Sequence, residues 1–232
     1  MVRHFRFFWV AAAAWLLFFS APTVVEAASP EAIGKVGALV GAVVAEGPGG
    51  KRTLQEGGAV YTSDSIATMA GANCRIDFTD NSTLSLDENS RVELTEYVYA
   101  PNQPSMSKAV LKLFKGLCRA VTGGIVKHNP QAYTLRTPLA NFGIRGTEFY
   151  ASIEPNGENL GVLAMDRGHT VEIWTKVDRL QIKEAGYFTR VSMDGKLSPL
   201  MQIPKNVTNQ IMRVQQNMMR LKAAPPTMPH RR

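Results

Sequence analysis

The chain has 232 residues, of which 45% are hydrophobic and 19% charged, and its formal net charge is +7. This hydrophobic share is enough for a packed core, so disorder throughout is excluded, and the length suits one large all-β domain or two small ones. The basic balance favours anionic partners such as phospholipid surfaces, cell-wall polymers or acidic protein faces, or it serves solubility alone.

The N-terminus has the pattern of a secretory signal peptide. Arg3 and Arg6 precede an apolar run from Phe7 to Ser20, and the small-residue site Val25-Glu26-Ala27 follows. The run is short for a bilayer span, so we expect residues 1–27 to be a signal peptide cleaved near Ala27, with an uncleaved anchor as the alternative. The mature chain is then periplasmic or secreted, and nucleic acid is not expected as a partner.

From Val36 to Arg190 the chain consists of short β-type runs separated by turn residues. In one run Cys74, Ile76 and Phe78 alternate with charged residues, which predicts a strand with one buried face. We therefore predict an all-β, solenoid-like or sandwich-like domain of many short strands over residues 28–204. The expected strands are Val36–Val44, Tyr61–Thr68, Asn73–Phe78, Thr83–Leu86, Arg91–Leu94, Ala109–Phe114, Leu117–Val121, Tyr133–Thr137, Thr147–Glu154, Leu160–Met165, Thr170–Thr175, Arg179–Lys183 and Gly186–Val191.

After Pro204 the pattern changes to that of a helix. Ile211, Val214, Met218 and Leu221 recur at three- and four-residue steps, which predicts an amphipathic helix over residues 205–222. The helix is expected to pack on the sheet; association with a membrane or a partner helix through residues 206–222 is the alternative. Residues 223–232 are basic and proline-rich and are expected to be disordered.

The two cysteines of the chain, Cys74 and Cys118, form a disulfide in the expected oxidising compartment or serve as two small buried side chains. Sequence alone leaves both readings open, because a disulfide needs Cα atoms within about 7 Å of each other. His128 and His169 are isolated, so no metal site or cofactor is expected.

The least ordinary stretch of the sequence is Thr137–Tyr150. Pro138 forces Thr137 into an extended conformation and removes an amide donor. Gly143 and Gly146 are expected to take positive φ on either side of Arg145 and so to bend the backbone sharply. The guanidinium of Arg145 then either clamps its own loop through several hydrogen bonds or faces outward as an anion-binding group.

No catalytic set is evident in the sequence. Paired carboxylates such as Asp64 with Asp80, or Asp87 with Glu88, could serve hydrolysis, but they lie at expected turns, where acidic residues usually cap the backbone. Their spacing does not match a calcium loop. We therefore expect a protein that is not an enzyme.

Several short motifs occur together in a characteristic order. They are Asp64–Thr68, Asp80–Ser82, Leu84–Leu86, Lys115-Gly116 and Thr137–Phe149. In this order and spacing the chain resembles the FecR domain, a periplasmic regulatory module, over about Ile33 to Thr175. The resemblance implies structural or binding roles for the family-motif residues Asp64, Thr68, Asp80, Thr137, Pro138, Gly143, Arg145, Gly146 and Thr147.

The sequence departs from the family pattern in two ways. Ser63 and Asn81 replace family glycines, and Asn tolerates positive φ at modest cost. The membrane-bound regulators of the family also carry a cytoplasmic sigma-regulating segment, which we expect this chain to lack, so an anti-sigma role is not carried over.

The resemblance implies a non-enzymatic exported domain that binds a protein or cell-envelope partner in signal relay or scaffolding. The alternative is a carbohydrate- or peptidoglycan-binding module that reads an anionic polymer through basic residues. Nothing in the sequence indicates the oligomeric state.

Overall fold

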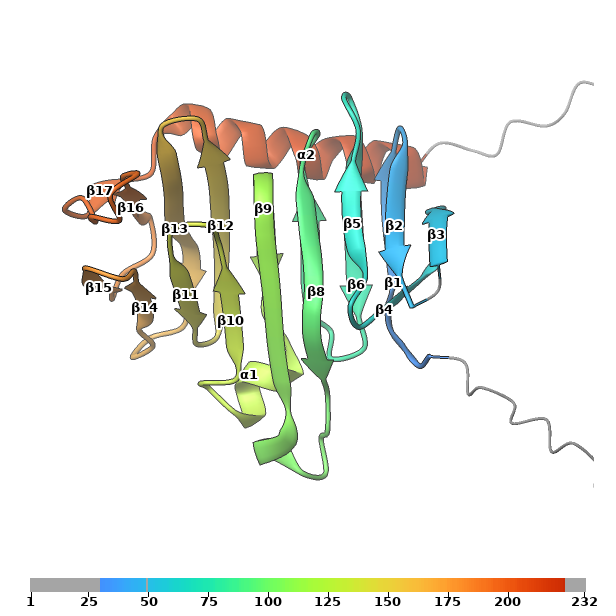
Figure 1. Cartoon of the computed structure of the whole chain (residues 1–232), viewed down its shortest axis with the longest axis horizontal. Helices are drawn as coiled ribbons and strands as arrows, with labels where there is room; N and C mark the ends of the chain where they lie inside the picture. Colours follow the sequence, from blue (N-terminus) through green and yellow to red (C-terminus); the bar gives the residue numbers. More distant parts are fainter. Residues whose placement is uncertain (1–29, 49, 224–232) are drawn as a thin grey trace, which may run out of the picture.

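The computed structural model describes residues 30–48 and 50–223, so the expected signal peptide and the tail from residue 224 lie outside the described residues. The described chain is mostly strand, with a long helix at its C-terminal end (Figure 1). The strands are β1 Ala32–Val40, β2 Val43–Gly47, β3 Gly50–Thr53, β4 Ala59–Tyr61, β5 Ser65–Thr68, β6 Asn73–Phe78, β7 Thr83–Leu86, β8 Arg91–Val98, β9 Lys108–Val121, β10 Tyr133–Arg136, β11 Asn141–Ile144, β12 Thr147–Glu154, β13 Gly157–Met165, β14 Val171–Trp174, β15 Arg179–Ile182, β16 Tyr187–Val191 and β17 Met201–Gln202. The helices are η1 Pro104–Met106, α1 Gly124–His128 and α2 Lys205–Ala223.

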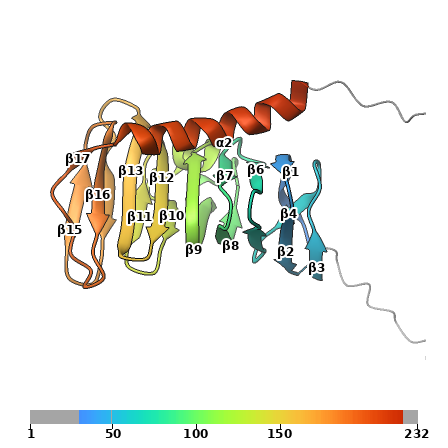
Figure 2. The same ribbon diagram turned by 90° about the horizontal axis from the view of Figure 1, so that it is seen from above.

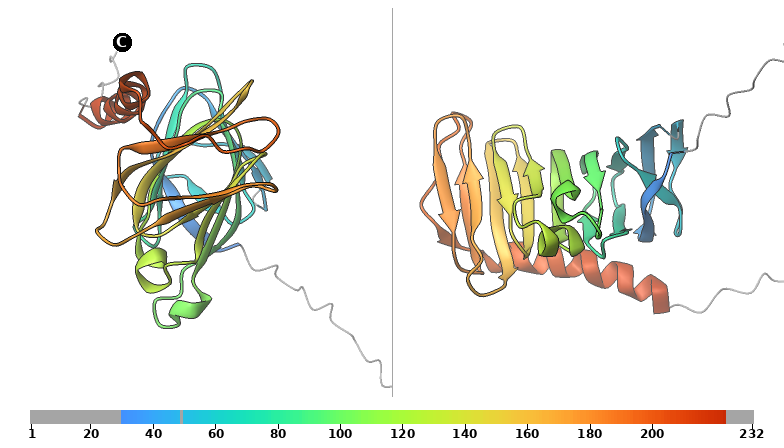
Figure 3. Two further views of the ribbon diagram at one scale, coloured as in Figure 1. Left: turned by 90° about the vertical axis from the view of Figure 1, so that its left-hand side faces the viewer. Right: turned by 90° about the horizontal axis from the view of Figure 1, so that it is seen from below.

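The strands form two layers that share β9. Sheet A has the order β4-β1-β6-β7-β9-β12-β13-β16-β17. Sheet B has the order β3-β2-β5-β8-β9-β10-β11-β14-β15, and its β9–β10 pair is parallel, whereas its other pairs are antiparallel. Seen end-on, the strands enclose a flattened ring (Figure 3). The predicted all-β class, solenoid-like or sandwich-like with a C-terminal helix, is confirmed.

The core lies between the two sheets. In β6 the side chains of Cys74, Ile76 and Phe78 are buried, as the period-two pattern predicted. In the second half of the chain the ring of Phe149 meets the ring of Phe142 edge to face, with centroids 5.3 Å apart. Each such buried apolar side chain contributes roughly 1.5–3 kcal/mol to folding, which makes this single core the main source of stability.

Several strand predictions are wrong in their bounds. The expected strand Tyr61–Thr68 is interrupted by a turn, because β4 ends at Tyr61 and β5 begins at Ser65. The expected strand Val36–Val44 is two strands, because Gly41 takes a φ of +71° and turns the chain from sheet A to sheet B. Conversely, Ala109–Phe114 and Leu117–Val121 are one strand, β9, which pairs in sheet B before Gly116 and in sheet A after it. The short helix α1 was not predicted, since five residues carry no helical period.

Gly116 makes the corner at which β9 passes between the sheets. Its φ is +81°, and a Cβ atom at this position would lie 2.2 Å from Oγ of Ser90 and 2.6 Å from the Cα atom of Ser90. The Ser90 hydroxyl occupies this space because it donates to the carbonyl of Leu117 at 3.1 Å and accepts from the amide of Leu117 at 3.0 Å. The corner thus needs both the left-handed conformation and the missing side chain.

We expect Gly116→Ala to lower the free energy of unfolding by roughly 2 kcal/mol more than Gly168→Ala does. Gly168 also has a φ of +81°, but a Cβ atom there would have no neighbour within 4 Å. Both variants therefore carry the same conformational cost, and the difference isolates the clash with Ser90. Urea unfolding of both variants measures it; equal losses would contradict this account of the corner.

The predicted C-terminal helix is present as α2 and lies on the outer face of sheet A. It runs across the strands along the long axis of the molecule (Figure 2). Ile211 packs with Tyr150 and Phe188, and Val214 packs with Ala38. The side chains of the other two residues of the expected stripe, at positions 218 and 221, lie outside the described residues. Within the described part of the chain, no helix is long and apolar enough to cross a membrane.

The two cysteines are free and buried. Cys74 pairs across β6–β7 with Leu86, and Leu86 pairs across β7–β9 with Cys118. Because neighbouring strands lie about 4.8 Å apart, the two Cα atoms are separated by roughly 10 Å, beyond the reach of a disulfide. The disulfide alternative is thus corrected, and the reading as two small buried side chains agrees with the structure. Burial raises the pKa of each thiol to about 12.

Candidate functional site

Asp64, the first acidic residue of the motif series, holds the turn between β4 and β5. Its carboxylate is fully buried and pairs with both terminal nitrogens of Arg52, at 3.1 and 2.5 Å. It also accepts from the amide of Tyr61 at 2.8 Å, and the guanidinium of Arg52 lies over the ring of Tyr61 at 4.9 Å. A bidentate pair of this kind fixes geometry as well as charge, so Asp64 serves the turn rather than an open site.

Asp80 performs a similar role between β6 and β7. Its Oδ1 accepts from the hydroxyl of Tyr97 at 2.5 Å and from the amide of Ser82 at 2.8 Å, and its Oδ2 accepts from the amide of Ile125 at 3.0 Å. The carboxylate thereby joins a turn of sheet A to β8 and to the start of α1. Burial first, and the charge of Asp80 second, raise the pKa of Tyr97 far above its usual value, so the phenol stays a donor.

Thr137 and Pro138 form a turn that is held by a carboxylate from a distant strand. Glu158 at the start of β13 accepts from the hydroxyl of Thr137 and, at 3.0 Å, from the amide of Leu139. The Thr137 hydroxyl also accepts from the amide of Ala140 at 3.1 Å. Glu158 is 2% exposed, and the desolvation of its carboxylate raises its pKa, while the two hydrogen bonds oppose the shift. We call Asp64, Asp80 and Glu158 the turn-holding carboxylates.

We expect Glu158→Gln to stabilise the protein relative to wild type by an amount that grows with pH. The pKa of Glu158 is raised on folding, so its contribution to stability is fully present below its ordinary value of 4.5 and is lost as pH rises through the folded pKa. Glutamine stays neutral and keeps one acceptor and one donor for Leu139 and Thr137. Melting temperatures measured from pH 4 to pH 8 test this, with the exposed Glu184→Gln as control. A difference between variant and wild type that is independent of pH would contradict it.

Thr68 closes the next turn of the chain. Its hydroxyl donates to the carbonyl of Asp87 at 2.6 Å and accepts from the amide of Ser90 at 2.9 Å. Thr68 is 2% exposed, and Ser90 is the residue that fills the space beside the corner glycine. Thr68 therefore belongs to the same internal network of turns and is not accessible to a ligand.

The expectations for Arg145 and its glycines need correction. The guanidinium of Arg145 makes no hydrogen bond or ion pair with any residue of 30–48 or 50–223; only its carbonyl is engaged, accepting from the hydroxyl of Thr147 at 3.0 Å. Gly146 has the expected positive φ, +62°, but Gly143 does not. Gly143 lies in β11, where a Cβ atom would be 3.0 Å from the ring of Trp174. Gly143 is thus required because the ring of Trp174 lies against it. The prediction that the guanidinium of Arg145 clamps its own loop is wrong.

One depression lies beside Thr137–Tyr150, which we call the signature stretch, at the point where β9, α1, β12 and β13 meet. Its volume is about 280 Å³, and its polar side chains are those of Thr122, Lys127, Thr147, Glu148, Asp166 and His169. A ring nitrogen of His169 lies 3.4 Å from the carbonyl of Gly146, and Glu148 is paired with Arg119 at 2.8 Å. Gly146 and Thr147 are the motif residues that line this depression, and the other motif residues do not line it.

Comparisons with known proteins show what this chain is similar to. Residues 64–166 match the family model described as FecR protein. This part of the chain is thus similar to FecR domains, as the motif series predicted. No curated protein matches the chain.

Among solved structures, two crystal structures described as an anti-sigma factor from Parabacteroides distasonis ATCC 8503 are similar to it. One has 13% identity and a TM-score of 0.45 over 60% of this chain and 59% of its own. The other has 14% identity and a TM-score of 0.48 over 63% and 64%. The chain thus spans less than two thirds of the length of either structure.

The turns of this domain use side chains that the motif series did not single out. Arg52, Ser90, Tyr97 and Glu158 each complete a turn that a motif residue begins. For Arg52, the available signal in the sequence was the aromatic Tyr61 and the turn residue Asp64 that follow it along the chain. The partner of Thr137 lies 21 residues away on another strand, so no local pattern could have identified Glu158.

Ser63 and Asn81 stand where the FecR pattern has glycine, and both take positive φ, +68° and +64°. The left-handed conformation that the family pattern requires is thus retained without glycine, at a modest cost for Asn. The acidic residues of the same turns hold these conformations in place.

Proposed function

We propose that this chain is an exported, non-enzymatic FecR domain protein that binds a protein or polymer of the cell envelope and serves in signal relay or scaffolding. The observation that carries the proposal is the FecR match over residues 64–166, together with the structural use of the signature residues. A domain whose characteristic side chains stabilise turns presents rigid surfaces for contact and holds no reacting groups in its signature.

The engagement of the acidic residues supports a non-enzymatic role. Asp64 and Asp80 are buried and fully hydrogen-bonded. Asp87 accepts from Asn73 at 2.9 Å and from Gln210 of α2 at 2.7 Å, and Glu88 accepts from the amide of Gly71 at 2.6 Å. General acid–base catalysis needs a carboxyl group within reach of a substrate, and the carboxylates of Asp64 and Asp80 are enclosed by the fold.

The signal-like N-terminus supports export. It predicts a mature chain that begins at residue 28, in a compartment where an envelope partner is accessible. The packing of Ile211 and Val214 of α2 on sheet A disfavours membrane attachment through the same apolar face, because these side chains are already buried.

The test uses the tagged full chain in the cells that produce it, and a second form that lacks residues 1–27 as a matched control. Mass spectrometry of the mature chain should give an N-terminus at residue 28, and osmotic shock should release it. After mild formaldehyde treatment of intact cells, the full chain should sediment as a larger, reproducible complex.

The control without residues 1–27 should remain in the cytoplasm and form no such complex. An unprocessed chain found in the cytoplasm would contradict export. An exported chain that sediments as a free protein at every cross-linker concentration would contradict the binding role.

A further inference from the structure

The outer face of sheet B carries a row of side chains that the FecR signature does not explain. At one level of the sheet, five neighbouring strands each contribute one residue in register: Lys112 on β9, Arg136 on β10, Asn141 on β11, Trp174 on β14 and Arg179 on β15. We call this set the cationic row. With about 4.8 Å between neighbouring strands, it extends over roughly 19 Å.

The cations of the row are exposed and placed side by side. Lys112 and Arg136 are directly paired on adjacent strands, an arrangement of like charges that costs stability. Neither makes an ion pair with another described residue. Glu93 neighbours Lys112 on the other side, and its carboxylate accepts from the hydroxyl of Thr95 at 3.1 Å. An anionic ligand would offset this unfavourable pairing.

A β-bulge adds two further contacts at one end of the row. The register shift between Arg91 and Val92 leaves Phe114 as the extra residue of β9. The ring of Phe114 lies 4.7 Å from Nζ of Lys112 and 5.6 Å from the guanidinium carbon of Arg91. These cation–π contacts hold both cations on the face of the sheet, where Arg91 continues the positive charge.

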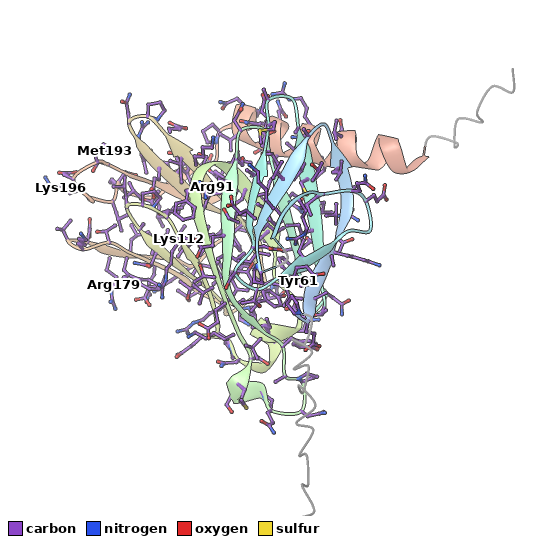
Figure 4. The ribbon with its side chains drawn as sticks, turned by 45° about the vertical axis from the view of Figure 1, so that its right-hand side comes forward. Tyr61, Arg91, Lys112, Arg179, Met193 and Lys196 are labelled. Carbon is purple, nitrogen blue, oxygen red and sulfur yellow. The ribbon has the colours of Figure 1, made fainter. Side chains whose placement is uncertain are left out.

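Figure 4 shows Arg91, Lys112 and Arg179 along one side of the molecule. Two carboxylates are paired with residues of the row: Glu93 on β8 lies opposite Lys112, and Glu172 forms an ion pair with Arg179 at 3.1 Å. Four cations, Arg136 included, thus meet two carboxylates, and the surface keeps an excess of positive charge. The helix α2 lies on the opposite sheet, so it does not cover the row (Figure 2).

Trp174 supplies a flat apolar surface within the row. The ring lies against the backbone of Gly143 on the neighbouring strand, where a Cβ atom would come within 3.0 Å of it. The residue is only half-buried, so part of the indole faces solvent. Gly143 therefore allows the indole to lie close to the sheet, between the amide of Asn141 and the guanidinium of Arg179.

We propose that the cationic row binds an anionic polysaccharide, a linear sugar polymer that carries carboxylate or phosphate groups. Arg and Lys side chains pair with such groups, an exposed indole stacks on the apolar face of a sugar ring, and an amide hydrogen-bonds hydroxyl groups. The row crosses five strands in a line, which suits a linear polymer better than a compact partner. This inference rests on the proposed placement of the chain in the cell envelope.

The test measures binding of the purified full chain to four polymers. Polygalacturonate supplies carboxylates, poly(glycerol phosphate) supplies phosphates, dextran is the neutral control and poly-glutamate represents an acidic polypeptide. We expect binding to one or both of the first two and none to dextran. Raising the ionic strength from about 0.05 M to about 0.5 M should weaken binding, because the contacts are exposed.

The decisive comparison uses two double variants with the same loss of charge. Lys112→Gln with Arg136→Gln should weaken polygalacturonate or poly(glycerol phosphate) binding at least about tenfold. Lys35→Gln with Arg213→Gln removes two exposed cations from β1 and α2 and should change it less than about twofold. Trp174→Ala should weaken binding to polygalacturonate, whose sugar rings can stack on the indole, and leave binding to poly-glutamate unchanged. Melting temperatures verify that all variants fold.

Three results would overturn the inference: equal weakening in both double variants, no binding to either anionic polymer, or tighter binding to poly-glutamate that is indifferent to Trp174→Ala. If the Lys112/Arg136 variant still forms the envelope complex in cells but no polymer binds, the row is assigned wrongly and the proposed function stands. Loss of export or of the complex in wild type would instead contradict the proposed function itself.

Discussion

Asp80→Ala is expected to lower the free energy of unfolding by about 4 kcal/mol, because three buried donors lose a charged acceptor at once. These donors are the hydroxyl of Tyr97 and the amides of Ser82 and Ile125. In a domain of this size that loss corresponds to a fall in melting temperature of roughly 10 °C. Thermal unfolding followed by circular dichroism measures it.

The control for this variant is Asp166→Asn, which changes an exposed acid and should alter the free energy of unfolding by less than about 0.5 kcal/mol. If Asp80→Ala lost less than about 1 kcal/mol, Asp80 would not be holding β8 and α1 to the turn as the hydrogen bonds indicate. A loss of stability below about 1 kcal/mol together with a loss of partner binding would instead point to a functional role for Asp80.

Arg52→Ala is expected to cost about 3 kcal/mol, because it leaves the carboxylate of Asp64 buried without its cation. Arg145→Ala, by contrast, should change the free energy of unfolding by no more than about 0.5 kcal/mol, since its guanidinium contacts no acceptor among the described residues. Urea unfolding of the two variants side by side measures the contrast. The Arg that clamps a loop in this domain is Arg52.

A double variant separates the unpaired charge from the lost contacts. Adding Asp64→Asn to Arg52→Ala should recover more than half of the loss, because the amide carries no charge that needs a partner. If the two substitutions were additive instead, the pair would contribute little through its charges. A larger loss for Arg145→Ala than for Arg52→Ala would restore the clamp reading of the signature.

Much of the fold could be predicted from local patterns. The strands Asn73–Phe78, Thr83–Leu86 and Thr147–Glu154 have the predicted bounds, because period-two alternation and turn residues define both ends. The helix also begins within one residue of its predicted start, since Pro204 marks the boundary. Local chemistry decides these features, so a single sequence is enough to find them.

The rest depends on contacts between distant residues. Period-two patterns give no indication of which strands pair, so neither the passage of β9 through both sheets nor the cationic row was readable from the sequence. Gly143 illustrates the limit: its position suggested positive φ, but its reason is the ring of Trp174, 31 residues further along the chain. The partner of a buried side chain is a property of topology.

The central claim is that the signature and its partners hold the turns of this domain, and that binding is left to its outer faces. Native-state amide hydrogen exchange tests it most directly at Tyr61, Ser82, Ile125 and Leu139, whose amides donate to the turn-holding carboxylates. Turn amides usually exchange by local opening. We predict that these four exchange as slowly as the amides of the central strands, through global unfolding alone. Exchange at the rate of exposed loops would contradict the claim.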